Sequence, residues 1–198
     1  MHNLTDSENV ILAEIKVAKN PFPHFSSAAV FKPSLVNCIF KWLEHCQLWS
    51  FTETNFYTQY EFSLLGLDLP PTLQSLNDPF TITFLITKFE TIFKKRLKVI
   101  DITAHKLIDG HRMGIHNDFI GDKETHRLVV QINPLWADKN GGYLLLFNSK
   151  DPEDVSKIVR PLNNTAIGFE ISEKSFHAVS TVHKFSRYTI VYTFNEAD

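Results

Sequence analysis

The chain has 198 residues, a length that suits one domain built around a single hydrophobic core. Apolar residues make up 43% and charged residues 21%, as in an ordinary globular protein. Its formal net charge is −2, so it has no basic surplus to follow a phosphate backbone, which argues against a nucleic-acid partner. We expect no signal peptide, because no basic flank and apolar run open the chain, and no membrane segment, because no apolar stretch is long enough.

The first elements in chain order are two strands and a helix. Residues 9–16 are predicted to form an opening strand, and the Pro-interrupted stretch 21–31 leads into a second one. From Ser34 to about Gln47 the apolar residues recur with a 3.6-residue period. This period predicts an amphipathic helix, and Pro33 stands where such a helix can begin.

Two cysteines fall within this first helix. Cys38 and Cys46 are eight positions apart (46 − 38), which puts them on one face but about two turns apart, too far for a disulfide. We expect both to be buried thiols. A reducing compartment suits such thiols, so a cytoplasmic location is predicted.

A second helix is predicted from Pro79 to about Leu97, after an aromatic-rich strand or ordered loop at 55–65. The basic residues 94–96 are expected in its last turn, where cations complement the helix dipole.

The pattern changes after residue 97, where short β-rich runs alternate with turn signals. These runs cover residues 98–107, 127–133, 142–147, 165–171, 177–182 and 187–194. Their number and spacing predict an α+β fold with a double-stranded β-helix (jelly roll) core and N-terminal helices packed on one face. We expect one domain over 1–198, with a helix-rich support region at 1–97 and a jelly-roll core with a metal site at 98–198.

The candidate metal ligands are His116, Asp118 and His177. If His116 and Asp118 lie in an extended strand, their side chains point to the same side. His177 begins a later predicted strand and supplies the third ligand. Two histidines and one carboxylate form the facial triad of non-haem Fe(II) oxygenases, which leaves neighbouring coordination positions open.

The last apolar strand contains an unexpected cation. Arg187 lies within a run that is otherwise typical of a buried strand, and Thr189 is on the same strand face. A buried guanidinium is costly unless it is paired with an anion, and its planar shape suits a carboxylate. We therefore predict that Arg187 and Thr189 bind a carboxylate ligand.

The chain resembles the prolyl-4-hydroxylase-like branch of the 2-oxoglutarate/Fe(II)-dependent oxygenases. The matching motifs, in chain order, are PFPHF, GHRMGIHND, RLVVQINPLW, GGYLLLF, SFHAVS and RYTIVYTF. The sequence departs from the family at Leu107, where many members have a tyrosine. The sequence around these motifs is also similar to that of bacterial oxygenases associated with cyclophane-containing ribosomal peptides.

This resemblance implies an enzyme that uses Fe(II), 2-oxoglutarate and dioxygen to hydroxylate an unactivated C–H bond. Iron would bind to His116, Asp118 and His177, and the far carboxylate of 2-oxoglutarate would pair with Arg187 and Thr189. His105 and Gln131 are further candidates for contacts with 2-oxoglutarate. Related halogenases lack the carboxylate ligand, so Asp118 favours hydroxylation, or a related desaturation or cyclisation, over halogenation.

The expected substrate is an amino-acid side chain of a ribosomally synthesised, cyclophane-containing peptide. Polar residues of the run 127–133 could line the cavity from one strand face, and two polar segments, 119–126 and 148–157, could cover it as loops. The candidate substrate contacts are Arg127, Asn133, Trp136 and His126.

Several alternatives stay open at this stage. The substrate could instead be a free or carrier-bound amino acid or a small metabolite. A metal-independent jelly-roll binding module would predict no metal binding, and a cupin-like Zn or Mn protein would not require Arg187. The sequence leaves the oligomeric state open.

Overall fold

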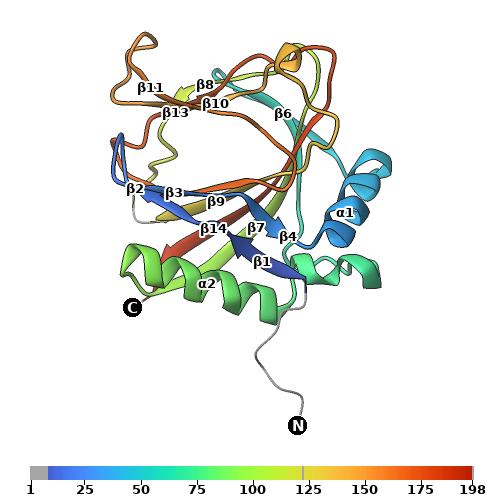
Figure 1. The fold of residues 1–198 in the computed structure, drawn as a ribbon. Coiled ribbons are helices and arrows are strands. Elements are labelled where there is room, and N and C mark those ends of the chain that lie inside the picture. The colour runs from blue at the N-terminus through green and yellow to red at the C-terminus, as the bar shows by residue number, and fades with distance from the viewer. Residues whose placement is uncertain (1–8, 122, 198) are drawn as a thin grey trace.

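The computed structural model describes residues 9–121 and 123–197, which form two facing antiparallel sheets with a small third one (Figure 1). The major sheet has the order β2-β3-β12-β9-β14-β7-β6-β5, the minor sheet β11-β10-β13-β8, and β1 pairs with β4. The strands of the first part are β1 Val10–Ala13, β2 Lys16–Ala18, β3 His24–Ser27, β4 Ala29–Phe31, β5 Ser50–Glu53 and β6 Thr58–Ser63. Those of the second part are β7 Leu97–Leu107, β8 Met113–His116, β9 His126–Gln131, β10 Leu144–Phe147, β11 Val155–Val159, β12 Ala166–Glu170, β13 His177–Val179 and β14 Arg187–Glu196.

The central strand β14 shows why the major sheet has two chemically different faces. Side chains alternate along a strand, so Tyr188, Ile190, Tyr192 and Phe194 point to one face and join the main hydrophobic core. Arg187 and the other odd-numbered residues point to the opposite face, towards the minor sheet. Residues 187–194 of β14 are buried on both faces, with apolar side chains on the core face and the polar Arg187, Thr189 and Thr193 on the other.

The helices contact the core face of β14. In α1 (Pro33–His45), Phe40 meets the ring of Tyr188 edge-on at 6.1 Å. In α2 (Pro79–Phe93), Phe89 stacks on Phe194 at 4.4 Å. Figure 1 shows α2 lying along the side of the major sheet that faces away from the minor sheet. Two short 3-10 helices, η1 (Pro71–Leu76) and η2 (Asp138–Asn140), complete the helical elements of the described residues.

Local signals set the ends of α2. The Asp78 side chain caps its N-terminus by accepting a hydrogen bond from the backbone N–H of Thr81 at 2.7 Å. The helix ends at Lys94, which has a left-handed backbone (φ 59°). The prediction that residues 94–96 form the last helical turn was therefore wrong, because the left-handed residue stops the helix at Phe93.

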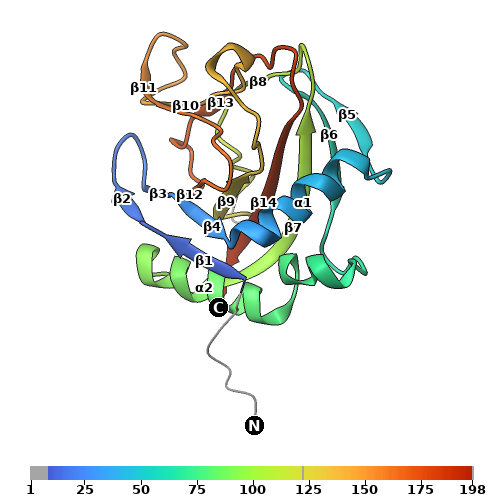
Figure 2. The same cartoon turned by 45° about the vertical axis from the view of Figure 1, so that its right-hand side comes forward.

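The first 97 residues also supply strands β1 to β6, not only helices. Figure 2 shows β5 and β6 at one side of the molecule, where they extend the major sheet beyond β7. β5 was not predicted, because its residues are mostly exposed and lack an apolar alternation. In the predicted loop 148–157, β11 begins at Val155, so its last residues pair with β10 as a hairpin.

The thiols differ from expectation in one respect. Cys38 is exposed on α1 and Cys46 is partly buried, so the prediction of two buried thiols was wrong for Cys38. The helical period placed both on one face but did not show which face would meet the sheet. Within the described part of the chain, no helix combines the length and apolar character needed to cross a membrane.

Candidate metal centre and adjoining cavity

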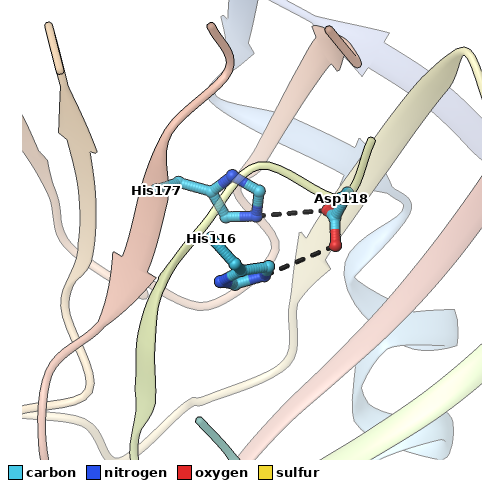
Figure 3. Close-up of side chains that lie close together, drawn as sticks. All are labelled: His116, Asp118 and His177. Atoms are coloured by element: carbon cyan, nitrogen blue, oxygen red, sulfur yellow. Dashed lines mark ion pairs between the residues drawn. The ribbon is translucent and has the colours of Figure 1, made fainter. Parts of the chain in front are cut away.

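Three side chains converge at the edge of the minor sheet. His116 ends β8 and His177 begins β13, and the two are directly paired in the antiparallel register. The His116 Nε2 lies 3.4 Å from Asp118 Oδ1, and the His177 Nε2 lies 3.2 Å from Asp118 Oδ2. Figure 3 shows both imidazole rings turned towards the carboxylate. One donor atom from each residue lies within 4.8 Å of the other two, so these residues could hold a metal ion.

Asp118 reaches this position by a different route from the predicted one. We expected strand alternation to bring His116 and Asp118 to one side, but β8 ends at His116 and Asp118 has a left-handed backbone (φ 59°). The turn between them is fixed by hydrogen bonds from the Asn117 amide to the Glu173 carbonyl and from the Ser175 hydroxyl to the Asn117 carbonyl. The turn therefore directs the carboxylate to the histidines.

Backbone contacts set the orientation of both imidazoles. His116 Nδ1 lies 2.8 Å from the Gly114 carbonyl, and His177 Nδ1 lies 2.7 Å from the Ser175 carbonyl. A carbonyl can only accept, so each Nδ1 carries the proton and donates it. The Nε2 lone pairs are left free for a metal, in the arrangement common to metal-binding histidines.

The charge of Asp118 is stabilised from its other side. Arg127 Nη1 lies 2.6 Å from Asp118 Oδ2, and the same guanidinium also binds Glu124. Burial acts to raise the pKa of Asp118, but the Arg127 guanidinium, together with the neighbouring His177 and His116 imidazoles, outweighs it and holds the pKa well below its ordinary value. Asp118 is therefore a carboxylate at neutral pH. Two imidazole nitrogens and one carboxylate oxygen are a donor set that fits Fe(II).

A cavity of about 590 Å³ opens beside these residues, between the two sheets. This volume falls within the range of small-molecule sites. His105, Arg127, Arg187 and Thr189 line it from the major sheet.

Arg187 is the most unusual residue of the cavity wall. Only 3% of its surface is exposed, and its Nε has no hydrogen-bond partner among the described residues. Burial lowers the pKa of Arg187 to about 10, which still leaves the guanidinium charged at neutral pH. A buried cation without a counter-charge is costly, so the site is suited to an anionic ligand.

The glycine pair before β10 makes room for this arginine. A Cβ on Gly142, whose φ is +68°, would lie 2.9 Å from Arg187 Cδ. The motif Gly141-Gly142 thus belongs to the cavity as well as to the turn.

Four predicted site residues do not line the cavity. His126 is fully buried on the other face of β9, where its ring lies 4.8 Å from that of Phe93. The Trp136 indole donates to the Gly141 carbonyl and packs edge-on against Tyr143 at 5.5 Å.

Asn133 forms hydrogen bonds with the backbone of two other segments and does not line the cavity. Its Oδ1 accepts from the Tyr188 N–H at 2.8 Å, and its Nδ2 donates to the Pro161 carbonyl at 3.1 Å. Gln131 pairs opposite Thr189 but is buried beside Asn133 and lies outside the cavity lining. Among the predicted substrate contacts, only Arg127 lines the cavity, and it is bound to Asp118.

Two predicted loops have different positions. From the first, 119–126, Phe119, Ile120 and Glu124 line the cavity. No residue of the second, 148–157, does so, because that segment forms the β10–β11 hairpin.

Sequence reasoning missed the wall built by β6 and the residues before it. Phe56, Tyr57, Gln59 and Glu61 line the cavity. The signal was weak, because 55–65 read as either strand or loop. The antiparallel pairing of β6 with β7, which places Glu61 beside His105, is a long-range contact.

The comparisons with known proteins agree with this geometry. Residues 102–194, which include the three candidate ligands, match the family described as the 2OG-Fe(II) oxygenase superfamily. A search of curated proteins gives no match.

The chain also matches solved structures. A prolyl-4-hydroxylase from Pseudomonas putida has a TM-score of 0.70 at 16% identity, covering 88% of this chain and 93% of that one. A prolyl hydroxylase from Trichoplax adhaerens, in complex with a peptide fragment of hypoxia inducible factor, has a TM-score of 0.61 at 15% identity, covering 82% and 77%. A viral collagen prolyl hydroxylase from Paramecium Bursaria Chlorella virus-1, in complex with 2OG, has a TM-score of 0.60 at 10% identity, covering 82% and 90%. At these identities the likeness concerns the fold, and it confirms the predicted jelly roll.

The fold and the matched segment together define a non-haem iron dioxygenase. Residues 102–194 of this enzyme match the 2OG-Fe(II) oxygenase superfamily, and its co-substrates and cofactor are 2-oxoglutarate, dioxygen and Fe(II). The predictions of enzyme class and cofactors are confirmed.

Proposed function

We propose that His116, Asp118 and His177 bind Fe(II), that Arg187 and Thr189 bind the far carboxylate of 2-oxoglutarate, and that the enzyme hydroxylates an amino-acid side chain. The proposed substrate is a ribosomally synthesised, cyclophane-containing peptide. The observation that carries the cofactor assignment is the buried, unpaired guanidinium of Arg187 in the same cavity as the three ligands.

Arg187 suits a carboxylate because its planar donors match the two oxygens. Thr189 is two residues along β14 and shares its face, so its hydroxyl can add a hydrogen bond to the same group. His105 pairs directly opposite Thr189 on β7 and lines the cavity. Burial lowers the pKa of His105 to about 3, with the charges of Arg127 and Arg187 adding to the effect. Its neutral imidazole could therefore donate to 2-oxoglutarate without adding charge.

When bound, Fe(II) would activate dioxygen, so that one oxygen atom enters the substrate C–H bond as a hydroxyl group and the other oxidises 2-oxoglutarate to succinate and CO2. The residues of the chain hold, orient and shield these groups. The Nδ1 hydrogen bonds keep the two imidazoles in the metal-binding tautomer, and Arg127 keeps Asp118 ionised and oriented. The presence of the carboxylate ligand favours hydroxylation over halogenation.

A peptide substrate is supported by the space available and by a neighbour. The cavity is larger than 2-oxoglutarate needs, and exposed apolar residues, including Phe56, Phe119 and Ile120, lie on its wall. The Trichoplax adhaerens enzyme was solved with a peptide. The cyclophane assignment rests on the sequence motifs alone, and a free or carrier-bound amino acid is the second candidate.

The ligand assignment is tested with Asp118→Ala. We expect this variant to lose binding of Mn(II), used as a spectroscopic probe of the metal site, and to form no succinate from 2-oxoglutarate, because one of three ligands is missing. Binding is measured by electron paramagnetic resonance and succinate by mass spectrometry. Asp68→Ala, which removes a carboxylate outside the cavity, is the control and should behave as the wild type. Full succinate formation by Asp118→Ala would refute the assignment.

The substrate assignment needs a different experiment. A short precursor peptide encoded beside a radical-SAM maturase gene would be incubated with enzyme, Fe(II) and 2-oxoglutarate. Gain of one oxygen atom on that peptide is the expected result. An unmodified peptide together with turnover on free amino acids would favour the second candidate.

A further inference from the structure

Three carboxylates of the described residues line the cavity in addition to Asp118, and two of them are compensated, one by three hydrogen-bond donors and one by an ion pair. Asp101 accepts hydrogen bonds from Ser63 Oγ, the Ile102 backbone N–H and Thr103 Oγ1. Glu124 is paired with Arg127. Glu61, on β6, is the third.

Glu61 has hydrogen-bond donors but no cation among the described residues. Its Oε1 accepts from the Thr52 hydroxyl at 2.8 Å, and its Oε2 accepts from the Gln59 amide. The basic group within ion-pair distance is His105, whose Nε2 lies 3.8 Å from Oε2. Since burial lowers the pKa of His105 to about 3, this imidazole is neutral at physiological pH. The Glu61 side chain keeps 30% of its surface exposed, so a ligand can reach it.

Gln59 gives an independent indication of a ligand at the same place. Its exposed fraction is 3%, it lines the cavity, and its Oε1 has no hydrogen-bond partner in the described part of the chain. The Gln59 amide has its NH2 group towards Glu61, because a carboxylate oxygen can accept a hydrogen bond from the NH2 group but not from the carbonyl oxygen. The carbonyl oxygen must therefore point away from Glu61. A buried carbonyl without a donor costs free energy that a ligand N–H group would recover.

The two acceptors are complementary to one kind of group. An ammonium or guanidinium supplies several N–H donors and a positive charge, and charge-assisted bonds of this kind are about twice as strong as neutral ones. A neutral amide would satisfy the Gln59 oxygen but leave the Glu61 charge uncompensated.

The position of Glu61 is compatible with simultaneous binding of 2-oxoglutarate. Glu61, His105 and Thr189 lie side by side on three neighbouring strands, in the register given by the sheet. With strands about 4.8 Å apart, Glu61 lies roughly 10 Å across the sheet from Thr189. A cation at Glu61 would therefore not compete with the carboxylate proposed at Arg187.

We propose that the substrate carries a cationic nitrogen group, an ammonium or a guanidinium on an aliphatic stem, and that Glu61 and Gln59 bind this group. The inference rests on the proposed function, since it assigns the substrate class of the same site. Lysine- and arginine-like side chains have the required form, and Phe56 and Tyr57 line the same cavity as the two acceptors, where they offer apolar surface to an aliphatic stem.

The test compares charged and neutral side chains of similar shape. The enzyme is loaded with redox-inert Zn(II) and 2-oxoglutarate and titrated with N-acetyl-lysine methylamide or its arginine analogue, followed by two-dimensional NMR. The neutral counterparts are the norleucine and citrulline compounds. We expect the cationic probes to bind at least tenfold more tightly, with shifts at cavity residues.

Variants of Glu61 locate this preference. In Glu61→Gln the cationic and neutral probes should bind with about equal affinity, since the amide keeps a hydrogen-bond acceptor for Thr52 but loses the charge. Glu61→Asp should retain part of the preference for cationic probes. Glu53→Gln, on the neighbouring β5 and outside the cavity lining, is the matched control and should retain all of it.

Equal binding of cationic and neutral probes by the wild type, no saturable binding of the cationic probes, or an unchanged preference in Glu61→Gln would each overturn the inference. The affinity for 2-oxoglutarate is measured in the same samples. If 2-oxoglutarate binds normally while the charge preference is absent, the substrate inference fails alone. If 2-oxoglutarate does not bind the wild type, the proposed function fails.

Discussion

Arg187 places a positive charge within the protein without a compensating group from the described residues. In the absence of ligand this charge destabilises the fold, because a buried ion loses its hydration and gains no partner. When a carboxylate binds, the same charge becomes a source of affinity. The residue therefore links stability of the enzyme to occupancy of its proposed 2-oxoglutarate site.

We predict opposite effects of Arg187→Met on stability and binding. Without 2-oxoglutarate, the variant should be as stable as the wild type or more stable, because methionine fills a similar space without charge. With 2-oxoglutarate at about a hundred times its Kd and Zn(II) present, the wild type should gain about 2.7 kcal/mol and the variant almost nothing. Urea unfolding with and without 2-oxoglutarate measures both effects. Arg160→Met, at an exposed arginine, is the control, and equal stabilisation of Arg187→Met by 2-oxoglutarate would contradict the prediction.

At the scale of elements, the turn before β10 brings its backbone close to a side chain of β14. Gly142 has a positive φ and lies against the Arg187 side chain. Gly110 also has a positive φ, +84°, but a Cβ added there would meet no described atom within 4 Å. A substitution at either glycine would strain the backbone, but only at Gly142 would the added Cβ also contact the Arg187 side chain.

Gly142→Ala should weaken 2-oxoglutarate binding at least tenfold, because its methyl group would displace the Arg187 guanidinium that we propose binds the carboxylate. Gly110→Ala should cost about 1 kcal/mol of stability from backbone strain alone and leave 2-oxoglutarate affinity unchanged. Calorimetric titration of 2-oxoglutarate into the Zn(II)-loaded proteins provides the affinities. Equal affinities in the two variants would show that the contact with Arg187 is unimportant.

At the scale of the whole molecule, stability depends on the layer between α2 and the major sheet. His126 is fully buried in this layer beside Phe93, and its Nε2 has no hydrogen-bond partner among the described residues. Burial lowers the pKa of His126 to about 4, from an ordinary value of 6.5. The folded protein thus holds His126 neutral, whereas the unfolded chain takes up a proton near pH 6.5.

This difference predicts a loss of stability in mild acid. A histidine with a lowered pKa has no effect above pH 6.5 and destabilises the fold progressively as the pH falls from 6.5 towards 4. Between pH 7.5 and pH 5 the contribution of His126 amounts to about 2 kcal/mol. His126→Phe should lose stability less steeply over this interval, as measured by urea unfolding of the metal-free protein. His45→Gln, at an exposed histidine, should follow the wild-type slope, and a parallel slope for His126→Phe would contradict the assignment.

Strand alternation explains both the successes and some of the errors of sequence reasoning. It correctly placed Arg187 and Thr189 on one face of β14. The same rule indicates that His126 shares the core face with Leu128, so its assignment as a substrate contact could have been avoided. Gln131 and Asn133 share the parity of Arg127, and only the three-dimensional packing shows that they lie away from the cavity.

The sequence by itself determined which residues are candidates for the metal centre and the co-substrate site. The residue types and order of His116, Asp118, His177 and Arg187 indicated the oxygenase chemistry, and the superfamily match confirms the enzyme class. Local rules also predicted the two α-helices and most strands of the second half, because period and turn residues depend on neighbours in the chain.

Only the tertiary structure decided what shares the cavity with that centre. Glu61 and Gln59 come from a part of the chain predicted only as strand or loop, and β-sheet pairing brings them beside His105. The left-handed turn at Asp118 likewise depends on contacts with Glu173 and Ser175. Alternation fixes which side of a strand a residue faces, whereas long-range packing determines what lies on that side. For this enzyme, long-range packing shapes the proposed substrate site.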